Sequence, residues 1–371
     1  MLAFEKQSLR FDVDIGVEGA FDFLSAEYRS FHNLRRATIF QSPLWLDAIH
    51  RKLVPNLSAT PYTLTIRCRH DRALLALIPL VVQKSAGLLI LQPADFGVCD
   101  YNAIVADPLV LETLASDPSV LERIDALLGI ASVLMFRKVR DDGFDARRLF
   151  KKTTASACEN AAYHSEIGDD FEAWQRRTIR RKFSKELSRL GRQIEREFGR
   201  YEQRPAASEG EIRQALAFLR DTRKGRFEAD LLDSEVYFSF YSDYAVAAAQ
   251  SGEAVTYVSY LNGKPVAVLF GLAGDEQFHA VLIGADIDNY GKFSLGTQII
   301  YRVIKLRFDQ GFQRVDMGLG NTGYKSHFRV DQTTLHNFTA SRSLAGSALS
   351  LIYHRTKPLK NALRKYAPQL R

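Results

Sequence analysis

The chain has 371 residues, of which 46% are hydrophobic and 25% are charged. This composition is typical of a folded globular protein and is long enough for two domains. Its three cysteines follow no CxxC spacing, which argues against a disulfide framework or structural zinc and indicates a reducing compartment. The sequence starts without the apolar core of a signal peptide, and its longest apolar run, 73–82, is too short to span a membrane. We therefore expect a cytoplasmic protein.

The net charge of +7 is unevenly distributed. Residues 332–371 contain no Asp or Glu but seven Lys and Arg residues, as many as the excess of the whole chain. A second basic stretch, 171–200, has ten Lys and Arg residues against four Glu. Such stretches favour an acidic partner such as cofactor phosphates, anionic lipid or nucleic acid, although for any single cation a solvated helix face is the better explanation.

The first half is expected to form a short helix, a run of strands, a second helix and a final strand. Ser42 and Pro43 have the residue types of a helix start. The helices are expected at 43–49 and 120–128, and the strands at 62–68, 73–82, 88–91, 101–105 and 133–139.

The middle of the chain is expected to form one long basic helix over 171–199. Its apolar residues recur at steps of three and four: Ile179, Phe183, Leu187, Leu190, Ile194 and Phe198. Gly199 has the residue type of a helix C-cap.

The second half repeats this order. Helices at 209–220 and 234–250 precede a hairpin of strands 255–260 and 266–272, joined by Asn262-Gly263, a strong turn signal. A third strand at 277–283, a helix at 295–310 and strands at 314–317 and 334–341 follow. The same element order thus occurs twice, which favours a duplicated α/β unit.

The order of meander, helix and strand resembles the GNAT acyltransferase fold. The individual motifs resemble its CelD/BcsL-like branch, relatives of the FemAB-type peptidyltransferases with tandem GNAT domains. They are FQSPLWLDAI (40–49), LLALIPLVV (74–82), DYNAIV (100–105), RRKFSKELSRLGR (180–192), NGKPVAVLFG (262–271), YGKFSLGTQII (290–300), DMGLG (316–320) and YKSHF (324–328). The chain departs from the family at Leu295, where Pro is usual, and at Phe328, where Trp is frequent.

The resemblance implies an α/β fold of two tandem GNAT-like domains, each a mixed, mostly antiparallel sheet flanked by helices. We place a non-catalytic N-terminal domain at 1–165 and the catalytic domain at 166–371. The second domain then includes the basic helix 171–199 and a basic C-terminal tail.

A site for acyl-CoA is expected at the start of the helix that begins near residue 295. Unpaired backbone N–H groups and the helix dipole favour an anion there, and Gly296 allows a pyrophosphate to approach the backbone. We assign Ser294, Leu295, Gly296 and Thr297 to this site, with Lys292 as a phosphate ligand. The same residues also fit an ordinary N-cap, a packing glycine and a surface lysine.

The resemblance further implies that strands 277–283 and 314–317 splay apart around the pantetheine arm. An amine nucleophile needs a base close to that splay, and His279 suits this chemistry. Strand alternation would put His279 on the face of Gln277, Val281 and Ile283. Asp316 can orient His279 or bind the amine. A buried, satisfied histidine and a structural carboxylate are the competing readings.

Two more residues follow the glycine-rich segment 318–323. By resemblance, Tyr324 is the acid that protonates the leaving thiolate. Lys325 is expected to hold a phosphate or an acceptor anion. No Ser/His/Asp set and no metal-ligand spacing stands out, so we expect direct attack on the thioester without an acyl-enzyme or a metal.

The sequence therefore predicts an N-acyltransferase that uses acyl-CoA and an amine acceptor. The acceptor is a long-chain lipid amine or an amino sugar of a polysaccharide precursor. The apolar and basic segment 347–371 suggests peripheral binding to anionic membrane at the inner face, with a packed helix as the alternative. Aminoacyl transfer from tRNA and a non-catalytic binder of membrane or nucleic acid are the other hypotheses, and no DNA-binding motif is present.

Overall fold

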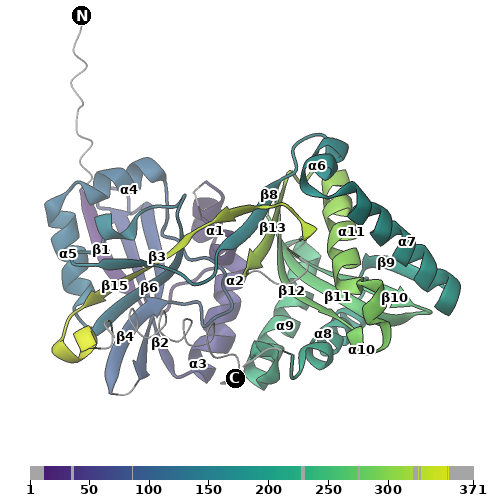
Figure 1. Cartoon of the computed structure of the whole chain (residues 1–371). Helices are drawn as coiled ribbons and strands as arrows, with labels where there is room; N and C mark the ends of the chain where they lie inside the picture. The colour runs from purple at the N-terminus through teal and green to yellow at the C-terminus, as the bar shows by residue number, and fades with distance from the viewer. Residues whose placement is uncertain are drawn as a thin grey trace, which may run out of the picture. The chain divides into compact units, whose positions relative to one another are not determined.

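The computed structural model describes residues 12–34, 37–85, 87–226, 230–274, 276–320, 325, 327–348 and 350. The chain forms two compact units, one of which runs to Glu159 and resumes at Thr334, while Asn160–Thr333 form the other. In each unit, helices cover a mixed sheet (Figure 1). The expected α/β class is thus confirmed. None of the described helices is both long and apolar enough to cross a membrane.

The first unit is a sheet with strand order β1-β2-β3-β4-β6-β15-β7, and β5 pairs with β3. The strands are β1 (Val13–Glu18), β2 (Ala59–Cys68), β3 (Leu74–Ser85), β4 (Leu88–Pro93), β5 (Val105–Ala106), β6 (Val133–Arg140), β7 (Thr154–Ala157) and β15 (Leu335–Ser341). The helices are α1 (Ala26–Asn33), α2 (Pro43–Ala48), α3 (Val54–Asn56), α4 (Pro108–Ala115) and α5 (Pro118–Leu128). Apolar side chains of α4 and α5 pack on the sheet in one core.

The second unit is a sheet with strand order β14-β8-β13-β12-β11-β10-β9. The strands are β8 (Ala162–Glu166), β9 (Tyr201–Pro205), β10 (Ala254–Leu261), β11 (Lys264–Ala273), β12 (Gln277–Ala285), β13 (Arg314–Leu319) and β14 (Asp331–Thr333). The helices are α6 (Phe171–Thr178), α7 (Arg181–Phe198), α8 (Glu209–Arg223), α9 (Glu235–Ser251), α10 (Ile287–Tyr290) and α11 (Leu295–Asp309). Helices α6, α7 and α11 share a core with one face of the sheet, whereas α8 and α9 pack on the other.

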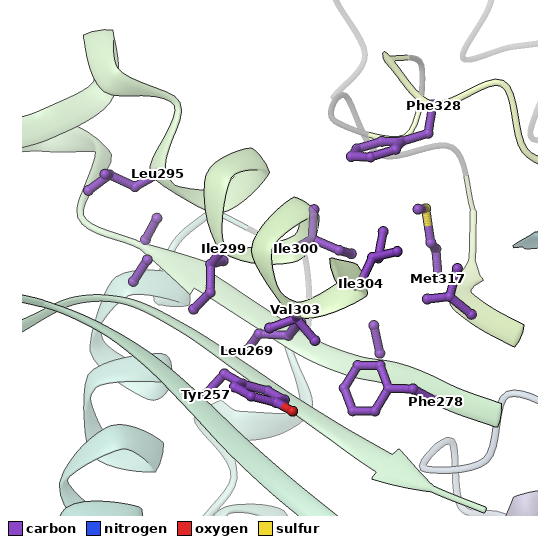
Figure 2. Packing of buried hydrophobic residues seen from close by; sticks show 14 of the residues in the cluster. Tyr257, Leu269, Phe278, Leu295, Ile299, Ile300, Val303, Ile304, Met317 and Phe328 are labelled. Atoms are coloured by element: carbon purple, nitrogen blue, oxygen red, sulfur yellow. The ribbon is translucent and has the colours of Figure 1, made fainter. Parts of the chain in front are cut away.

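The helix α11 is anchored because its apolar residues recur at helical spacing and meet the sheet. Figure 2 shows the α11 residues Leu295, Ile299, Ile300, Val303 and Ile304 beside Tyr257, Leu269 and Phe278 of β10, β11 and β12. Each of these side chains is buried. At about 25 cal/mol per Å² of buried apolar surface, such contacts hold the start of α11 against β12, where the candidate site lies.

The two units exchange a strand. The strand β15, from the end of the chain, lies between β6 and β7 of the first sheet. The strand β8, from the segment after the first unit, lies between β13 and β14 of the second sheet. The strand β15 thus follows the second unit in sequence but completes the first sheet, and β8 follows β7 of the first sheet but completes the second; Figure 1 shows β15 near β6 and β8 near β13.

This exchange changes the boundary drawn from the sequence. The domain boundary expected after residue 165 assigned all but the last residue of the strand 162–166 to the first domain and the strand 334–341 to the second. The structure pairs β8 with the second sheet and β15 with the first. Alternation of apolar residues predicts a strand but does not identify the strand beside it, which explains the difference.

The basic segment 171–199 is not one helix. It is divided into α6 and α7 at Ile179, which has an extended backbone with φ −118° and ψ 128°. Ile179 forms an antiparallel bridge with Phe328, and the carbonyl of Thr178 accepts a hydrogen bond from the N–H of Arg329. This long-range pairing interrupts a segment whose own periodicity favours a continuous helix. The C-terminal segment 347–371, which is expected to bind membrane, lies outside the described residues apart from 347, 348 and 350.

Candidate active site

The strands β12 and β13 are neighbours at one end only. Their parallel pairing consists of Gln277 with Arg314, Phe278 with Val315 and His279 with Asp316. Both strands continue beyond the last pair without further register between them. The strands thus part after His279 and Asp316, and among the described residues no strand pairs with the edge of β12 that follows, so an extended ligand can pair with the backbone groups there.

A β-bulge determines which side chains of β12 lie on which face. Across β11, Phe270 pairs with Leu282 and Gly271 pairs with Ala280, so Val281 is the extra residue. Beyond the bulge, Ile283 packs with the α11 core. The expectation that His279 shares a face with Ile283 is therefore wrong, because the bulge reverses the alternation.

The face occupied by His279 is the one on which α8 and α9 pack. His279 pairs with Leu272 of β11, two residues from Phe270, and the Phe270 ring packs against Tyr241 and Tyr244 of α9. On the opposite face, Phe278 and Ala280 contact the α11 core. A donor held beside α11 and a nucleophile on the α8/α9 face would therefore meet where β12 and β13 part.

His279 and Asp316 lie together at that point, as the sequence predicted. Both are fully buried, and Nδ1 of His279 is 3.4 Å from Oδ1 of Asp316. The same carboxylate oxygen accepts a 2.7 Å hydrogen bond from the N–H of Gly318. Burial of a carboxylate is costly without such partners, and here they also fix its orientation toward the imidazole.

Lys325 has a different environment from the one expected. Its ammonium donates to the carbonyl oxygens of Gly318, Leu319 and Gly320 at 3.1, 2.8 and 2.8 Å, and the residue is almost fully buried. A lysine ammonium has three N–H donors, and these three carbonyls match them. Lys325 therefore holds the end of β13 in place instead of presenting a charge to an anion. Tyr324 lies outside the described residues.

The start of α11 has the form of an anion site. Ser294 is the N-cap residue with a left-handed backbone, φ 52° and ψ 43°, and its side chain makes no capping bond. Ser294 is exposed, Gly296 is half-buried, and Leu295 and Thr297 are buried. A Cβ at Gly296 would lie 3.9 Å from Ile283 and 4.0 Å from Ala285, which is ordinary contact. Protein packing alone therefore does not require glycine there.

Lys292 precedes this helix start in the 3-10 turn Gly291–Phe293. Its Nζ lies 2.9 Å from a carboxylate oxygen of Glu197 on α7, and the lysine side chain is 62% exposed. An exposed ion pair of this kind contributes little to stability. A ligand phosphate can replace Glu197 as its partner.

Two arginines that the sequence analysis did not assign to the donor site lie at the end of β12. Arg223 of α8 donates to the carbonyl of Ile283 at 2.9 Å and pairs with the buried Asp230. Arg226 donates to the carbonyl of Ala285 at 3.4 Å and pairs with Asp288 of the short helix α10. The available signal was the run RDTRKGR after a helix, but nothing in it indicated the strand that its arginines contact.

Gly284 permits this close approach of α8. A Cβ there would lie 2.6 Å from Oγ1 of Thr222 and 2.9 Å from a methyl group of Leu219. Such distances are not tolerated without displacement. The glycine therefore lets α8 lie directly on β12 and brings Arg223 to the strand.

The first unit has a different cluster beyond β4. Asp95 is fully buried, with Arg137 at 3.3 Å, Lys138 at 3.5 Å and Asn102 at 2.9 Å. Burial alone would raise the pKa of Asp95, but the two cations and the hydrogen bonds hold it below its usual value. These contacts fix the loop after β4. Within the described residues, no group of three or more His, Cys, Asp and Glu is arranged to hold a metal.

Known proteins share this architecture. Residues 175–326 match the family described as acetyltransferase (GNAT) domain. FemX is 9% identical, with a TM-score of 0.58 over 88% of this chain and 97% of that chain. L-PGS from Bacillus licheniformis is 11% identical, with a TM-score of 0.53 over 88% of this chain and 94% of that chain.

A third solved structure is the C-terminal domain (DUF2156) assigned to a lysylphosphatidylglycerol synthetase from Agrobacterium fabrum. It is 10% identical, with a TM-score of 0.53 over 87% of this chain and 93% of that chain. No curated protein sequence matches the chain at a significant level. Residues 175–326 are thus similar to a GNAT acetyltransferase domain, and the chain as a whole shares its two-sheet fold with FemX.

Proposed function

We propose that the protein is an N-acyltransferase that transfers an acyl group from acyl-CoA to an amine by direct attack on the thioester. The observation that carries this proposal is the parting of β12 from β13 immediately after His279 and Asp316. In this arrangement the donor's reactive end lies at the vertex of the two strands, and the acceptor approaches on the α8/α9 face.

The donor assignment is supported by two features at the ends of β12. The pantetheine arm is an extended chain with amide groups, which suits an open strand edge. The pyrophosphate suits the N-terminus of α11, where N–H groups and the dipole favour negative charge and Gly296 admits close approach. Thr297, Leu295 and Ser294 complete this turn, with Lys292 as the proposed phosphate ligand.

The chemistry of the acceptor requires a base, because an amine attacks only in its neutral form. His279 is proposed as that base, with Asp316 holding its imidazole in orientation. Tyr324 stays our proposal for the acid that protonates the thiolate. Lys325 holds the carbonyls at the end of β13 and is proposed to position that segment.

Comparison of the two sheets supports catalysis in the second unit. The bulges of β6 and β13 align Phe136 with Asp316. The β4/β6 pairing ends at Leu91 and Leu134, and extension of its register by two residues places Pro93 at the position of His279. The first unit therefore has two apolar residues where the second has an acid–base pair. We propose that the first unit binds or positions rather than catalyses.

For the acceptor we favour a long-chain lipid amine at the membrane surface, with an amino sugar of a polysaccharide precursor as the second class to test. The support is the sequence of the tail, in which cations alternate with apolar residues and acids are absent after Asp331. A cytoplasmic protein that binds peripherally to the inner face would use the tail in this way.

The first experiment is a thermal-unfolding series with CoA, acetyl-CoA and palmitoyl-CoA on the wild type and Gly296→Asp. A ligand at about 100 times its dissociation constant adds roughly 2.7 kcal/mol to the free energy of unfolding. An aspartate at the start of α11 interacts favourably with the helix dipole, and its Cβ would lie no closer than 3.9 Å to its neighbours, so we expect the variant to fold as stably as the wild type. It should nevertheless lose the ligand shift through repulsion of the pyrophosphate.

A larger shift with palmitoyl-CoA than with acetyl-CoA would indicate a fatty-acyl donor. Equal shifts in the wild type and Gly296→Asp would contradict the assignment of the pyrophosphate to α11. If none of the three ligands raises the midpoint, acyl-CoA is not the donor. Titration with aminoacyl-tRNA then tests the FemAB-like alternative, and binding of polyanions that carry no acyl group, such as deacylated tRNA, without any effect of CoA would indicate a non-catalytic role.

A further inference from the structure

We propose that a row of four side chains across the second sheet, His279, Asp316, His164 and Asp331, carries the proton released by the acceptor amine from the vertex of β12 and β13 to the surface. In this row, His164 positions the His279–Asp316 pair and passes the proton on from it. The proposal rests on the acyl transfer proposed above and deepens it.

The row follows from the strand register. His279 of β12 pairs with Asp316 of β13, Asp316 pairs with His164 of β8, and His164 pairs with Asp331 of β14. Residues directly opposite one another share a face of the sheet, with Cβ atoms about 4.5–5.5 Å apart in antiparallel pairs. Bases and acids therefore alternate on one face across four neighbouring strands.

The exposure of these residues increases along the row. His279 and Asp316 are fully buried, His164 is half-buried and Asp331 is exposed. Nδ1 of His164 is itself buried and has no hydrogen-bond partner among the described residues. A buried polar atom without a partner calls for a functional or structural reason, and a proton relay that passes through His164 supplies one.

The first unit shows that the fold does not need these four side chains. Its register aligns Phe136 with Asp316 and Phe338 with His164, because each pair flanks the same bulge. Phe338 in turn pairs with Ala155, at the place of Asp331. Extension of the β4/β6 register by two residues beyond Leu91 and Leu134 places Pro93 at the position of His279. The same four positions are thus apolar in one sheet and titratable in the other.

The reaction requires such a route because amines are protonated at neutral pH. An ammonium and a thioester give an amide, a thiol and one proton: the N–C bond forms, the C–S bond breaks, and the thiolate takes up one of the two protons that the nitrogen loses. The second proton must leave the site in every turnover. Since His279 is fully buried, a path through Asp316 and His164 brings that proton to Asp331 at the surface.

Few other charged or titratable groups are placed to interfere on this face. Arg314 and Glu166, two residues from Asp316 and His164 along β13 and β8, pair with each other at 2.8 Å. Tyr241 and Tyr244 of α9 pack against Phe270 beside His279. The row is thus flanked by a neutralised ion pair on one side and by aromatic rings on the other.

The test is an NMR titration of protein with isotope-labelled histidine, which reads the imidazole signals without any substrate. Wild type is compared with His164→Phe, His164→Gln and Asp331→Asn. His164→Phe introduces the residue that the first sheet has at this position, and His164→Gln keeps a polar group if the phenylalanine variant fails to fold. His336→Gln is the matched control, since His336 pairs with Asp141 in the first unit, 2.8 Å away and outside the row.

We expect the midpoint of the His279 titration to move by about one pH unit in both His164 variants and in Asp331→Asn, because the protonation of coupled sites is interdependent. The midpoint should stay unchanged in His336→Gln. A His279 signal that behaves identically in wild type and both His164 variants, including one that never titrates, would overturn the relay. This outcome is independent of CoA binding, so failure of the relay and failure of the proposed acyl transfer are separable.

Discussion

Lys138 of β6 and Gly318 of β13 occupy the same position in the two sheets. Each is the left-handed residue of a bulge, with φ 57° for the lysine and 73° for the glycine. Each backbone N–H donates to a side-chain oxygen, of Asn337 at 3.2 Å and of Asp316 at 2.7 Å. The shared irregularity relates the two halves more closely than any identity between their sequences.

The bulge in the second sheet predicts the effect of Gly318→Ala. A Cβ in the left-handed region costs roughly 1–2 kcal/mol, so we expect the free energy of unfolding to fall by about that amount. Denaturant titration measures it. Gly16→Ala in β1 is the control because a Cβ there meets nothing within 4 Å, and equal effects of the two substitutions would contradict the explanation.

The contact of α8 with β12 predicts a second effect. Gly284→Ala forces a Cβ against Thr222 and Leu219 and should destabilise the protein by about 1–3 kcal/mol, as overpacking does. Because α8 also carries Arg223 to β12, binding of CoA should weaken in the same variant. Calorimetric titration with CoA on the folded fraction measures this. Unchanged affinity would show that the end of β12 does not take part in donor binding.

The proposed base predicts a large kinetic effect. His279→Gln should lower kcat/KM for amine acylation by about 10²–10⁴, the usual contribution of a general base. Release of CoA thiol with a panel of lipid amines and amino sugars measures the rate. His336→Gln should leave it unchanged. A loss smaller than tenfold in a folded His279→Gln would remove this residue from the mechanism.

His50 predicts a pH dependence of stability. Burial lowers the pKa of this histidine from 6.5 to about 4, and its ring packs on Phe23 at 4.6 Å. The unfolded chain therefore binds a proton that the folded protein excludes. The contribution of His50 to the free energy of unfolding is therefore fully present above about pH 6.5. It decreases by up to about 3 kcal/mol as the pH falls toward and below 4.

The variant His50→Phe should flatten this part of the curve. The measurement is the free energy of unfolding in denaturant at steps between pH 7 and 4. His70→Gln is the control, because His70 is exposed in the turn after β2. A wild-type slope that persists in His50→Phe would assign the acid sensitivity to other groups.

Much of the fold was predictable because its signals are local. The Asn262-Gly263 turn has the positive φ angles, 50° and 78°, that such a pair favours, and it joins β10 to β11 as expected. The break at Ile179 was not predictable, since it depends on pairing with Phe328 nearly 150 residues away. Likewise, apolar alternation predicted the strand 334–341 without indicating that β6 and β7 are its neighbours.

The candidate site was predictable to the same extent. The sequence predicted that His279 lies near Asp316, because the resemblance implies that their strands are neighbours. The bulge at Val281 reversed the face of Ile283, and no sequence pattern marked it. The pairing of His164 with Asp316 also escaped prediction, because β8 reaches the second sheet only through the exchange of strands.

The exchange of strands also sets an order for synthesis on the ribosome. The second unit has all its strands once Thr333 has been made, since β8 precedes it in the chain. The first unit, although it begins to emerge first, cannot join β6 to β7 until β15 follows. The earlier half of the polypeptide therefore matures last, and the edges of β6 and β7 await their partner throughout translation of the later half.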